Sequence, residues 1–396
     1  MIQTGELKKA AGGRGMSLAW HIVTCEYPPQ PGGVADYTRQ VARGLAAGGD
    51  RVHVWAPFSS EADDENGVQV HRLPGRFDSG SLAALGRGIS VAGPGRILVQ
   101  YVPQGYGMRG MNLPMCVWLF ERRRAGITIM FHEVAVPFSR NQPRRHNLIG
   151  AVQRAMAFVL MRTANRCLIS TSAWEPKLRA LGGAQMPIAL APVPSNVPLI
   201  DDGAGVRALR GALAAGGGGA IIGHFGTARE RWTAECLAAT VPEVLRDRPG
   251  ATFVLIGRDS LDLRNRVLAH APELHERVRA TGPLALDDIS RHLSACDVLW
   301  QPYADGASTR RTSLMAALAH GRAVLTTAGE LTEPLWHESG AVALADVGDA
   351  AACGAALAHL ANDAAQRARM GAAAAALYAQ RFELRHTIDA LRRACG

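Results

Sequence analysis

Residues Glu26–Tyr37 read EYPPQPGGVADY and join a short apolar run, His21–Cys25, to a helical pattern over Tyr37–Ala47. The order of strand, glycine-rich turn and helix is typical of the first unit of a parallel α/β sheet. Gly32 and Gly33 permit a tight turn and a close approach of the backbone to a ligand. The helix beyond them offers unpaired N–H groups and a positive dipole end to an anion. An ordinary strand–helix turn has the same pattern, and two adjacent glycines alone do not separate the two interpretations.

The same alternation continues along nearly the whole chain. β-Branched runs such as Ile97–Tyr101 and Ile127–Phe131 are separated by Ala-, Leu- and Arg-rich helical stretches such as Asn147–Thr163. Strands separated by helices predict right-handed βαβ units and parallel sheets covered on both faces. A second series begins at Ile221, after a stretch rich in Pro and Gly, 192–219, which we expect to be a linker.

We therefore expect an α/β protein of two facing Rossmann-like, doubly wound domains with a cleft between them. The first domain is expected to span 16–198 and the second 199–375, with residues 1–15 as a disordered arm. Ligands of open α/β sheets bind at the carboxyl ends of the strands, so candidate site residues are sought in the loops that follow strands.

Composition narrows the class of protein. The 396 residues are 48% hydrophobic and 19% charged, which excludes a disordered or fibrous chain. No run of about 18 apolar residues and no signal-peptide cleavage site is present. The seven cysteines are scattered, which favours buried thiols over disulfides or zinc. The net charge is +9, and all but three of the 43 basic residues are arginine, so any phosphate-binding cation is expected to be an arginine.

A second long stretch, Cys296–Val324, reads CDVLWQPYADGASTRRTSLMAALAHGRAV. It predicts a strand, a polar loop, a helix and another strand. Arg310 and Arg311 stand at the start of that helix, where cations oppose the dipole unless an anion is present. Both can neutralise phosphate charge. The loop before them contributes candidate backbone donors for a sugar and a diphosphate at Gly306, Ser308 and Thr309.

Together with the Gly49–Val54 segment GDRVHV, these two stretches resemble the family 4-like, group 1 glycosyltransferases of the GT-B fold. The resemblance covers most of the chain from His21 onward. It implies two Rossmann-like domains, with the last helix, 376–396, crossing back to the first domain. It also implies that a sugar passes from a nucleotide-diphosphate sugar to an acceptor hydroxyl with retention of configuration. The nucleotide sugar (UDP or GDP type) is then a substrate, and neither a cofactor nor a metal is implied.

The family carries two glutamates separated by seven residues in the second stretch, the first near the hexose hydroxyls and the second on the nucleotide ribose. Asp305 stands at the first place and Ser313 at the second. A shorter carboxylate still accepts hydroxyl protons, whereas a serine is a weaker ribose anchor. The resemblance thus implies catalytic roles for Asp305 and Arg310, with Ser313 among the donor contacts.

Another family site follows the strand Ile221–Phe225, where a glycine-rich turn precedes an arginine and a lysine that grip the donor diphosphate. Gly226 and Thr227 form the corresponding turn here. Arg229 or Arg231 would replace the pair, because no lysine is nearby. Either arginine could equally be solvent-exposed at a helix start.

The family also has a histidine near the reacting carbon, after the strand that matches Ile127–Phe131. His132 takes that place and is a candidate catalytic residue that positions a sugar hydroxyl or the acceptor. Glu133 beside it is a candidate acceptor contact. A lone histidine at the end of an apolar strand is otherwise more often a structural residue.

Two further loops leave cleft-edge strands. Glu330 and Glu333 are candidates for donor hydroxyls in place of the glutamate missing at 313, although the same segment also fits a short-helix cap. Gln104 and Tyr106 are candidates for the acceptor pocket, although their loop could be a simple connection.

Motifs that are missing from the sequence argue against several other functions. It has no phosphate-loop, zinc-protease, serine-hydrolase or simple dinucleotide motif, and no aromatic–basic interleaving typical of nucleic-acid binding. A non-catalytic binding module and a sugar-nucleotide epimerase on the same double-Rossmann plan stay open as alternatives. Because no signal or spanning segment is found, we expect a cytoplasmic enzyme. The net charge of +9 with Arg140, Arg144 and Arg145 favours loose contact with the anionic inner membrane face, although such arginines more often lie on the wet face of a core helix. The expected acceptor is a saccharide or lipid-linked saccharide in polysaccharide or glycoconjugate assembly. The Arg, Ala and Gly bias is typical of a GC-rich bacterial genome.

Overall fold

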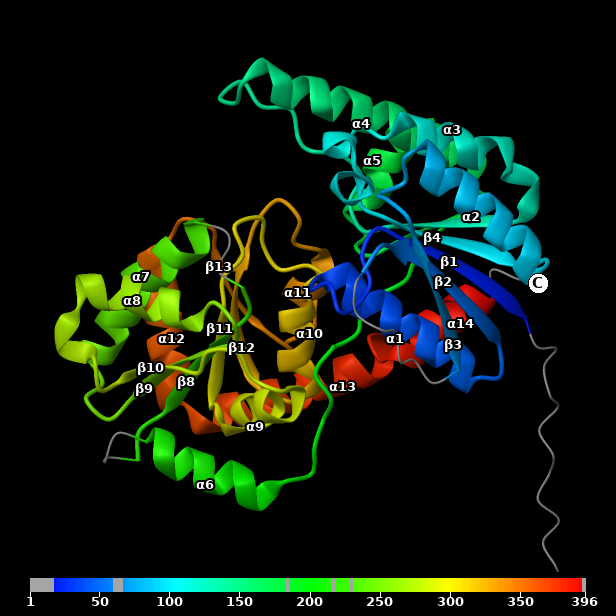
Figure 1. Ribbon diagram of the computed structural model, residues 1–396. Helices are drawn as coiled ribbons and strands as arrows, with labels where there is room; N and C mark the ends of the chain where they lie inside the picture. Colours follow the sequence, from blue (N-terminus) through cyan, green and yellow to red (C-terminus); the bar gives the residue numbers. More distant parts are fainter. Residues whose placement is uncertain (1–17, 60–66, 183–184, 215–217, 228–230, 394–396) are drawn as a thin grey trace, which may run out of the picture.

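A computed structural model describes residues 18–59, 67–182, 185–214, 218–227 and 231–393 (Figure 1). The expected arm, 1–15, lies outside the described residues. The two halves of the chain form two α/β bodies side by side, and the last helices run from the second body to the first.

Seven parallel strands form the first sheet in the order β3-β2-β1-β4-β5-β6-β7. The strands are β1 (Ala19–Thr24), β2 (Arg51–Pro57), β3 (Val68–Leu73), β4 (Arg96–Tyr101), β5 (Ile127–Phe131), β6 (Arg166–Ile169) and β7 (Ile188–Leu190). The helices are α1 (Gly33–Ala47), α2 (Ser79–Ala92), α3 (Leu113–Glu121), α4 (Arg144–Thr163) and α5 (Trp174–Ala180), with 3-10 turns η1 (Pro103–Tyr106), η2 (Met108–Gly110) and η3 (Arg123–Ala125). The strand order reverses between β1 and β4, which is where such sheets open a ligand crevice.

Six parallel strands form the second sheet in the order β10-β9-β8-β11-β12-β13, which repeats the order of the first. The strands are β8 (Ile221–Phe225), β9 (Thr252–Ile256), β10 (Val278–Ala280), β11 (Val298–Gln301), β12 (Ala323–Ala328) and β13 (Ala343–Asp346). The helices are α6 (Gly203–Leu213), α7 (Arg231–Arg246), α8 (Ser260–His270), α9 (Leu286–Ala295), α10 (Thr312–Ala319), α11 (Pro334–Glu338), α12 (Ala350–Asn362), α13 (Ala364–Arg381) and α14 (Leu384–Arg393), with the 3-10 turn η4 (Pro272–Leu274). The predicted fold class, two doubly wound domains, is confirmed.

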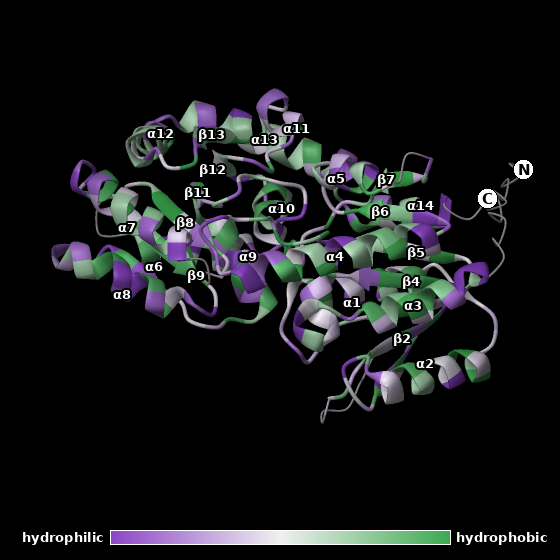
Figure 2. Ribbon diagram, turned by 90° about the horizontal axis from the view of Figure 1, so that it is seen from above, coloured by the Kyte–Doolittle hydropathy of each residue, from purple (hydrophilic) through white to green (hydrophobic). Residues whose placement is uncertain are grey.

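Both faces of the first sheet are buried, which explains why its strands are continuous apolar runs. Val99 and Ile129 join the core beneath α2, α3, α4 and α5, whereas Leu98 and Met130 join the core beneath α1 and α14. The strands are accordingly mostly green in Figure 2, while the covering helices carry hydrophilic residues outward.

The stretch 192–219 is not a linker throughout, which corrects the sequence prediction. It contains α6, whose N-cap Asp202 accepts a hydrogen bond from the N–H of Gly205 at 2.9 Å. Arg291 on α9 also donates to Asp202 at 2.7 Å, which ties α6 to the second domain. Gly203 and Gly205 in its first turn are why the segment resembles a loop in sequence.

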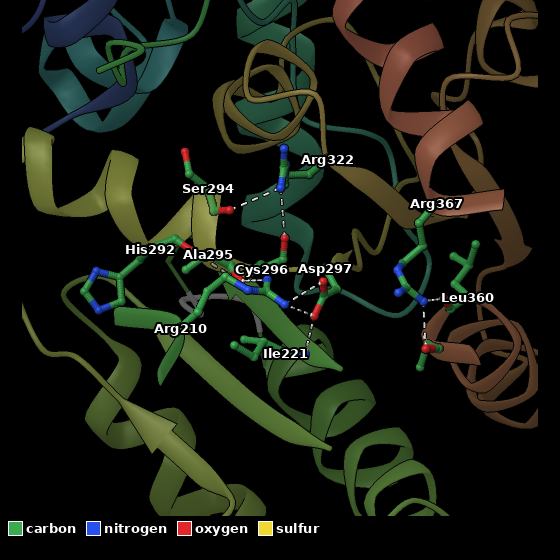
Figure 3. Close-up of polar contacts among 11 residues, drawn as sticks. Arg210, Ile221, His292, Ser294, Ala295, Cys296, Asp297, Arg322, Leu360 and Arg367 are labelled. Atoms are coloured by element: carbon green, nitrogen blue, oxygen red, sulfur yellow. Dashed lines mark hydrogen bonds and ion pairs between the residues drawn. The ribbon is translucent and has the colours of Figure 1, made fainter. Parts of the chain in front are cut away.

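Arginines close the carboxyl ends of helices at the amino edge of the second sheet (Figure 3). Arg210 donates to the carbonyl of Ala295 at 2.5 Å, at the end of α9, and forms a bidentate pair with Asp297 at 3.0 and 3.1 Å. Arg367 donates to the carbonyl of Leu360 at 2.8 Å, near the end of α12. A cation at a helix carboxyl end satisfies its free carbonyls and its dipole.

The last two helices connect the domains. α13 packs on α10 and β12 of the second domain, whereas α14 packs on α1 of the first. Ile388 and Leu391 of α14 enter the core of the first domain. Arg392 donates to Asp50 at 2.9 Å, and the Tyr378 hydroxyl of α13 accepts from the N–H of Ser195 at 3.0 Å.

Three histidines form a ladder across β1, β2 and β3. His21 and His53 are register partners with ring centroids 5.2 Å apart, and the centroids of His53 and His71 are 5.3 Å apart. Trp55 stacks on His71 at 4.0 Å. Burial lowers the pKa of all three imidazoles, and the proximity of His21 lowers the pKa of His53 and His71 further.

This ladder predicts a loss of stability in mild acid. The unfolded chain binds protons at the ordinary histidine pKa of about 6.5, whereas the folded ladder binds them only at lower pH, so stability falls as pH falls below about 6.5. We expect the melting temperature to drop between about pH 7 and about pH 5, and His53→Gln to flatten that slope. Calorimetry over this pH range measures the melting temperature. His270→Gln, on the exposed side of α8, should keep the wild-type slope, and an equal slope in His53→Gln would contradict the ladder's role.

Candidate active site

Two loops from different domains bring charged groups together. The loop after β5 supplies His132 and Glu133, and the loop between β11 and α10 supplies Asp305, Arg310 and Arg311. Arg310 influences the pKa of both first-domain residues, and Arg311 and Asp305 also influence that of Glu133. These five sequence-predicted residues therefore lie in one place, although they come from strands in two sheets.

Asp305 lies between the two arginines. The Arg310 guanidinium is 2.5 Å from Oδ2 of Asp305, and the Arg311 guanidinium pairs with Oδ1. Arg311 also lies over the Tyr303 ring, 4.6 Å from its centroid. Two guanidiniums and one carboxylate leave this group with a net positive charge.

The loop that carries Asp305 makes a sharp turn. Gly306 has φ +88°, a conformation that favours glycine. A Cβ there would also collide with the backbone of Gly329 and the hydroxyl of Thr332. The Asp305 carbonyl accepts a hydrogen bond from the N–H of Leu331 at 2.8 Å. The loops after β11 and β12 therefore support each other, and Gly306 has a packing role.

Glu133 faces the arginines from the first domain. Burial raises its pKa, and the charges of Arg310 and Arg311 oppose that rise. A hydrogen bond from the exposed Gln104 also favours the ionised carboxylate. Gln104 and Glu133, both predicted acceptor contacts, are thus adjacent.

His132 is buried and fixed in orientation. Its Nε2 lies 2.8 Å from Oε1 of Gln100, an acceptor, so the ring proton is on Nε2 and Nδ1 keeps its lone pair. Burial lowers the pKa of His132 to about 3, with a further contribution from the Arg310 charge. The ring is therefore neutral at neutral pH. Tyr37 packs against it edge-on at 4.9 Å, and Trp174 Nε1 donates to its carbonyl at 2.9 Å.

Glu333 is a buried carboxylate at the contact between the domains, only 5% exposed. Its Oε1 accepts from the hydroxyl of Thr171 at 2.7 Å and from the N–H of Ser172 at 3.2 Å, both in the first domain. Its Oε2 accepts from the N–H of Thr309 and from Nε1 of Trp336, each at 2.8 Å, in the second domain. One side chain thus bridges the two domains, and we call these five residues the Glu333 cluster.

The Glu333 cluster corrects two expectations for donor contacts, those for Glu333 and for the N–H of Thr309. Glu333 has both carboxylate oxygens engaged by protein donors. The Thr309 N–H binds Glu333, and the Thr309 hydroxyl lies 2.7 Å from Oε1 of Glu333 and 2.8 Å from the carbonyl of Ser170. Ser308 is fully buried, so its side chain does not line an open site. The N–H of Thr309 thus serves the domain contact.

The amino end of α1 holds a carboxylate from the protein itself. Oε1 of Glu26 accepts from the N–H groups of Val34 at 3.0 Å and Ala35 at 3.1 Å. A Cβ on Gly32 would overlap this carboxylate, so Gly32 leaves room for Glu26. The carboxylate of Glu26 is therefore the anion at this helix end, whereas a contact of Gly32 or Gly33 with the donor stays a prediction.

Gly226 and Ser313 face each other between β8 and α10. Gly226 has φ +146°, and a Cβ there would lie 3.7 Å from both Cβ and Oγ of Ser313. Oγ of Ser313 is 2.8 Å from the hydroxyl of Tyr303. Burial raises the pKa of Tyr303 to about 12, so the phenol keeps its proton. The exposed Thr227 follows Gly226 and completes this polar edge.

The two other candidate cations stand apart. Arg231, the first residue of α7, is exposed and pairs with Glu235 one turn further along the helix at 2.6 Å. Arg229 lies outside the described residues. The positive charge that the structure brings to Asp305 therefore comes from Arg310 and Arg311.

Tyr106 belongs to the core, and its predicted role in acceptor stacking is wrong. Its side chain is fully buried, and its hydroxyl donates to the carbonyl of Gln100 at 2.7 Å. The glycine-rich segment coils into η1 and η2, which turns the ring inward against Phe77 at 4.7 Å.

Glu330 is exposed and pairs across the domain contact with Lys177 of α5 at 3.4 Å. Sequence analysis missed Lys177, Trp174 and the pair Thr171 and Ser172. The available signal was the polar run that directly follows β6, because polar side chains at the end of a parallel strand face the ligand edge of the sheet.

Within the described ranges, no group of three or more His, Cys, Asp or Glu residues is placed to hold a metal ion. The same ranges contain no helix with the length and apolar character needed to cross a bilayer.

The Glu333 cluster predicts a strong effect of a single substitution. Glu333→Ala removes the acceptor of several buried donors, so we expect the free energy of unfolding to fall by about 2–5 kcal/mol. We also expect a larger radius of gyration in solution scattering, because the domains lose their bridge. Glu330→Ala, three residues earlier but exposed, should cost less than about 1 kcal/mol. Equal effects of the two substitutions in urea unfolding would contradict the bridging role.

The second domain matches a known protein family. Residues 219–363 match the family model described as Glycosyl transferases group 1. The family resemblance is thereby confirmed for the second domain, and with it the predicted enzyme class. No curated protein sequence matches the chain.

Solved structures match over nearly the whole chain. Sucrose-phosphate synthase from Thermosynechococcus elongatus matches with a TM-score of 0.72 at 16% identity, over 95% of this chain and 98% of that one. Anabaena HepE in complex with UDP and glucose matches with a TM-score of 0.68 at 17% identity, over 95% of this chain and 98% of that one. WaaG, a glycosyltransferase involved in lipopolysaccharide biosynthesis, matches with a TM-score of 0.64 at 16% identity, also over 95% of this chain and 98% of that one. A putative UDP-N-acetylglucosamine 2-epimerase from Listeria monocytogenes matches with 0.58 at 13%, over 90% and 91%. These likenesses show the GT-B fold.

Proposed function

We propose that this chain is a retaining glycosyltransferase that moves a sugar from a nucleotide-diphosphate sugar to an acceptor hydroxyl. The observation that carries the proposal is the meeting of Asp305, Arg310 and Arg311 with His132 and Glu133 between two Rossmann-like domains. The group 1 match over the second domain supports it. Retention of configuration rests on the family resemblance.

The donor is expected to bind along the carboxyl edge of the second sheet. The complex of the Anabaena protein with UDP and glucose supports a UDP-type donor. An assay that compares UDP-sugars with GDP-sugars would test this choice. The ribose would meet the hydroxyls of Ser313 and Tyr303, which are 2.8 Å apart, in place of a carboxylate. A hydroxyl pair holds a ribose diol less strongly than an ionised acceptor does.

Arg310 and Arg311 would stabilise the departing diphosphate. Both guanidiniums already hold an anion, Asp305, in the geometry that a phosphate oxygen would take. A diphosphate would compete with Asp305 for them, and the released carboxylate could then accept a hydrogen bond from a hexose hydroxyl. Stabilising charge on the leaving group lowers the barrier without a metal.

His132 would act as a neutral acceptor. Its Nε2 proton is committed to Gln100, so Nδ1 is the atom available to a sugar hydroxyl near the reacting carbon. Because its pKa of about 3 keeps it uncharged, it orients the sugar without repelling positive charge that develops there. Glu133 stands beside it, where its carboxylate can accept the acceptor's hydroxyl proton.

Removing Arg310 tests this mechanism. We expect Arg310→Ala to lower turnover by about 10²–10³, because one charge on the departing diphosphate is lost. The unfolding midpoint should stay close to wild type, since the side chain is partly exposed. The control is Arg246→Ala, which removes the exposed last residue of α7. Arg246 pairs with Glu273 of η4, and its loss should leave turnover unchanged. Unchanged turnover in Arg310→Ala would refute the role.

Two alternatives share the fold. The Listeria structure shows that a putative epimerase has the same plan, so a donor incubated without acceptor should be followed by NMR. Slow release of free sugar supports a transferase, whereas an epimerised nucleotide sugar supports the epimerase. A rise in melting temperature with no turnover would identify a non-catalytic module.

The acceptor side also suggests contact with a membrane. Arg140, Arg144 and Arg145 are exposed at the start of α4, next to the exposed Phe138 and Leu148. Basic residues with nearby apolar side chains bind anionic lipid surfaces. The proposed location is the cytoplasmic face of the inner membrane, with a saccharide or lipid-linked saccharide as acceptor.

Co-sedimentation with phosphatidylglycerol vesicles measures this contact. We expect binding at low salt that weakens at high salt, by about 1 kcal/mol for each basic residue near the surface. Replacing Arg140, Arg144 and Arg145 by serine should abolish it. Replacing three exposed arginines of the last two helices, Arg369, Arg381 and Arg385, changes the net charge equally and should not abolish binding. Equal loss in both triple variants would show attraction by net charge alone.

A further inference from the structure

A pocket of about 340 Å³ opens between the loop after β5, α5 and the second domain. Its lining includes Lys177, which lies 4.8 Å from the centroid of the Trp174 ring, and Arg310 of the candidate active site lies 5.8 Å from the same centroid, so the pocket lies next to that site. Val134, Ala135, Pro137 and Leu181 give it aliphatic walls. A volume of about 300–1,000 Å³ is typical of small-molecule sites.

The wall of this pocket is held in place by α4. The N–H of Val136 donates to Oε1 of the fully buried Gln153 at 2.8 Å, and the carbonyl of Val136 accepts from Arg154 at 3.1 Å. A Cβ on Gly150 would lie 3.1 Å from that carbonyl and 3.4 Å from the ring of Phe138, so α4 approaches the loop closely. Hydrogen bonds on both sides of Val136 give the loop one conformation, and the pocket is preformed.

The rim of the pocket is cationic. Arg154 lies over the Phe138 ring at 3.8 Å, and Lys177 lies over the Trp174 ring at 4.8 Å. Glu330, the acid in the lining, is paired with Lys177. An apolar interior with charged groups at its mouth suits an amphiphile whose apolar group enters the pocket and whose polar group stays at the mouth.

We propose that this pocket binds the aliphatic part of the acceptor. The accepting sugar would lie at Glu133 and His132, and an alkyl chain attached to it would lie against Val134, Ala135 and Leu181. This inference rests on the proposed transferase function and specifies the acceptor as a lipid-type glycoside. The walls are mostly aliphatic, which favours a chain over an aromatic aglycone.

Acceptors of graded length test the proposal on the full chain. Methyl, butyl, hexyl and octyl glucosides are supplied with a nucleotide sugar, and transfer is measured by mass spectrometry. We expect KM to fall about three- to fourfold for each added methylene until the chain outgrows the pocket. Hexyl glucoside should be a better acceptor than phenyl glucoside, which has the same number of carbons in its aglycone. A preference for phenyl would overturn the lipid-type occupant.

Two substitutions locate the effect. Ala135→Trp fills the pocket and should abolish the dependence of KM on chain length, and Phe138→Ser, at an exposed loop position, should weaken it. Phe158→Ser changes a partly exposed phenylalanine of α4 outside the lining and should keep the wild-type dependence. If all three variants respond to chain length like wild type, the pocket is not the acceptor site.

Failure of the inference is distinguishable from failure of the proposed function. If wild type transfers or hydrolyses a nucleotide sugar but shows the same KM for methyl and octyl glucosides, the pocket proposal is wrong and the transferase proposal stands. If no nucleotide sugar binds or is consumed with any acceptor or with water, the transferase proposal itself fails.

Discussion

A single buried carboxylate, Glu333, joins the two domains next to the candidate site. A buried ionisable group is costly unless its oxygens are hydrogen-bonded, and donors from both domains are needed to satisfy this one. The loop that carries Arg310 and Arg311 is fixed through the N–H of Thr309, and the end of β6 is fixed through Thr171. The distance between the charged residues of the two domains therefore depends on a contact that itself binds no substrate.

Much of the fold could be predicted because buried parallel strands are continuous apolar runs. The predicted strands Ile127–Phe131 and Ile221–Phe225 coincide with β5 and β8. α6 was not predictable in the same way, since glycines occupy its first turn and its stability comes from contacts with α9, such as that of Arg291 with Asp202. Local sequence does not contain that tertiary contact.

The sequence predicted which strand ends carry the candidate site residues, but not the contacts of their side chains. His132 and Asp305 were expected at the ligand edge because parallel strands end there, and the structure brings them near each other. The sequence did not show which acceptor binds each backbone N–H donor. Glu26 and Glu333, two of the protein's own carboxylates, take backbone donors that the pattern offered equally well to a phosphate. Competition between an internal and an external anion is decided only in three dimensions.

Lysine is rare in this chain, and this has a consequence for chemical labelling. Lysine occurs only at positions 8, 9 and 177, and structural cations such as Arg210 and Arg367 are guanidiniums bound to helix carbonyls. Guanidiniums do not react with amine-selective acylating reagents under mild conditions. Lys177 is therefore the one side-chain amine among the residues that the structure describes, and it stands at the domain contact beside Glu330. A succinimidyl-ester fluorophore would report from that place, and shortening the chain before residue 18 would leave only the terminal amine as a second label.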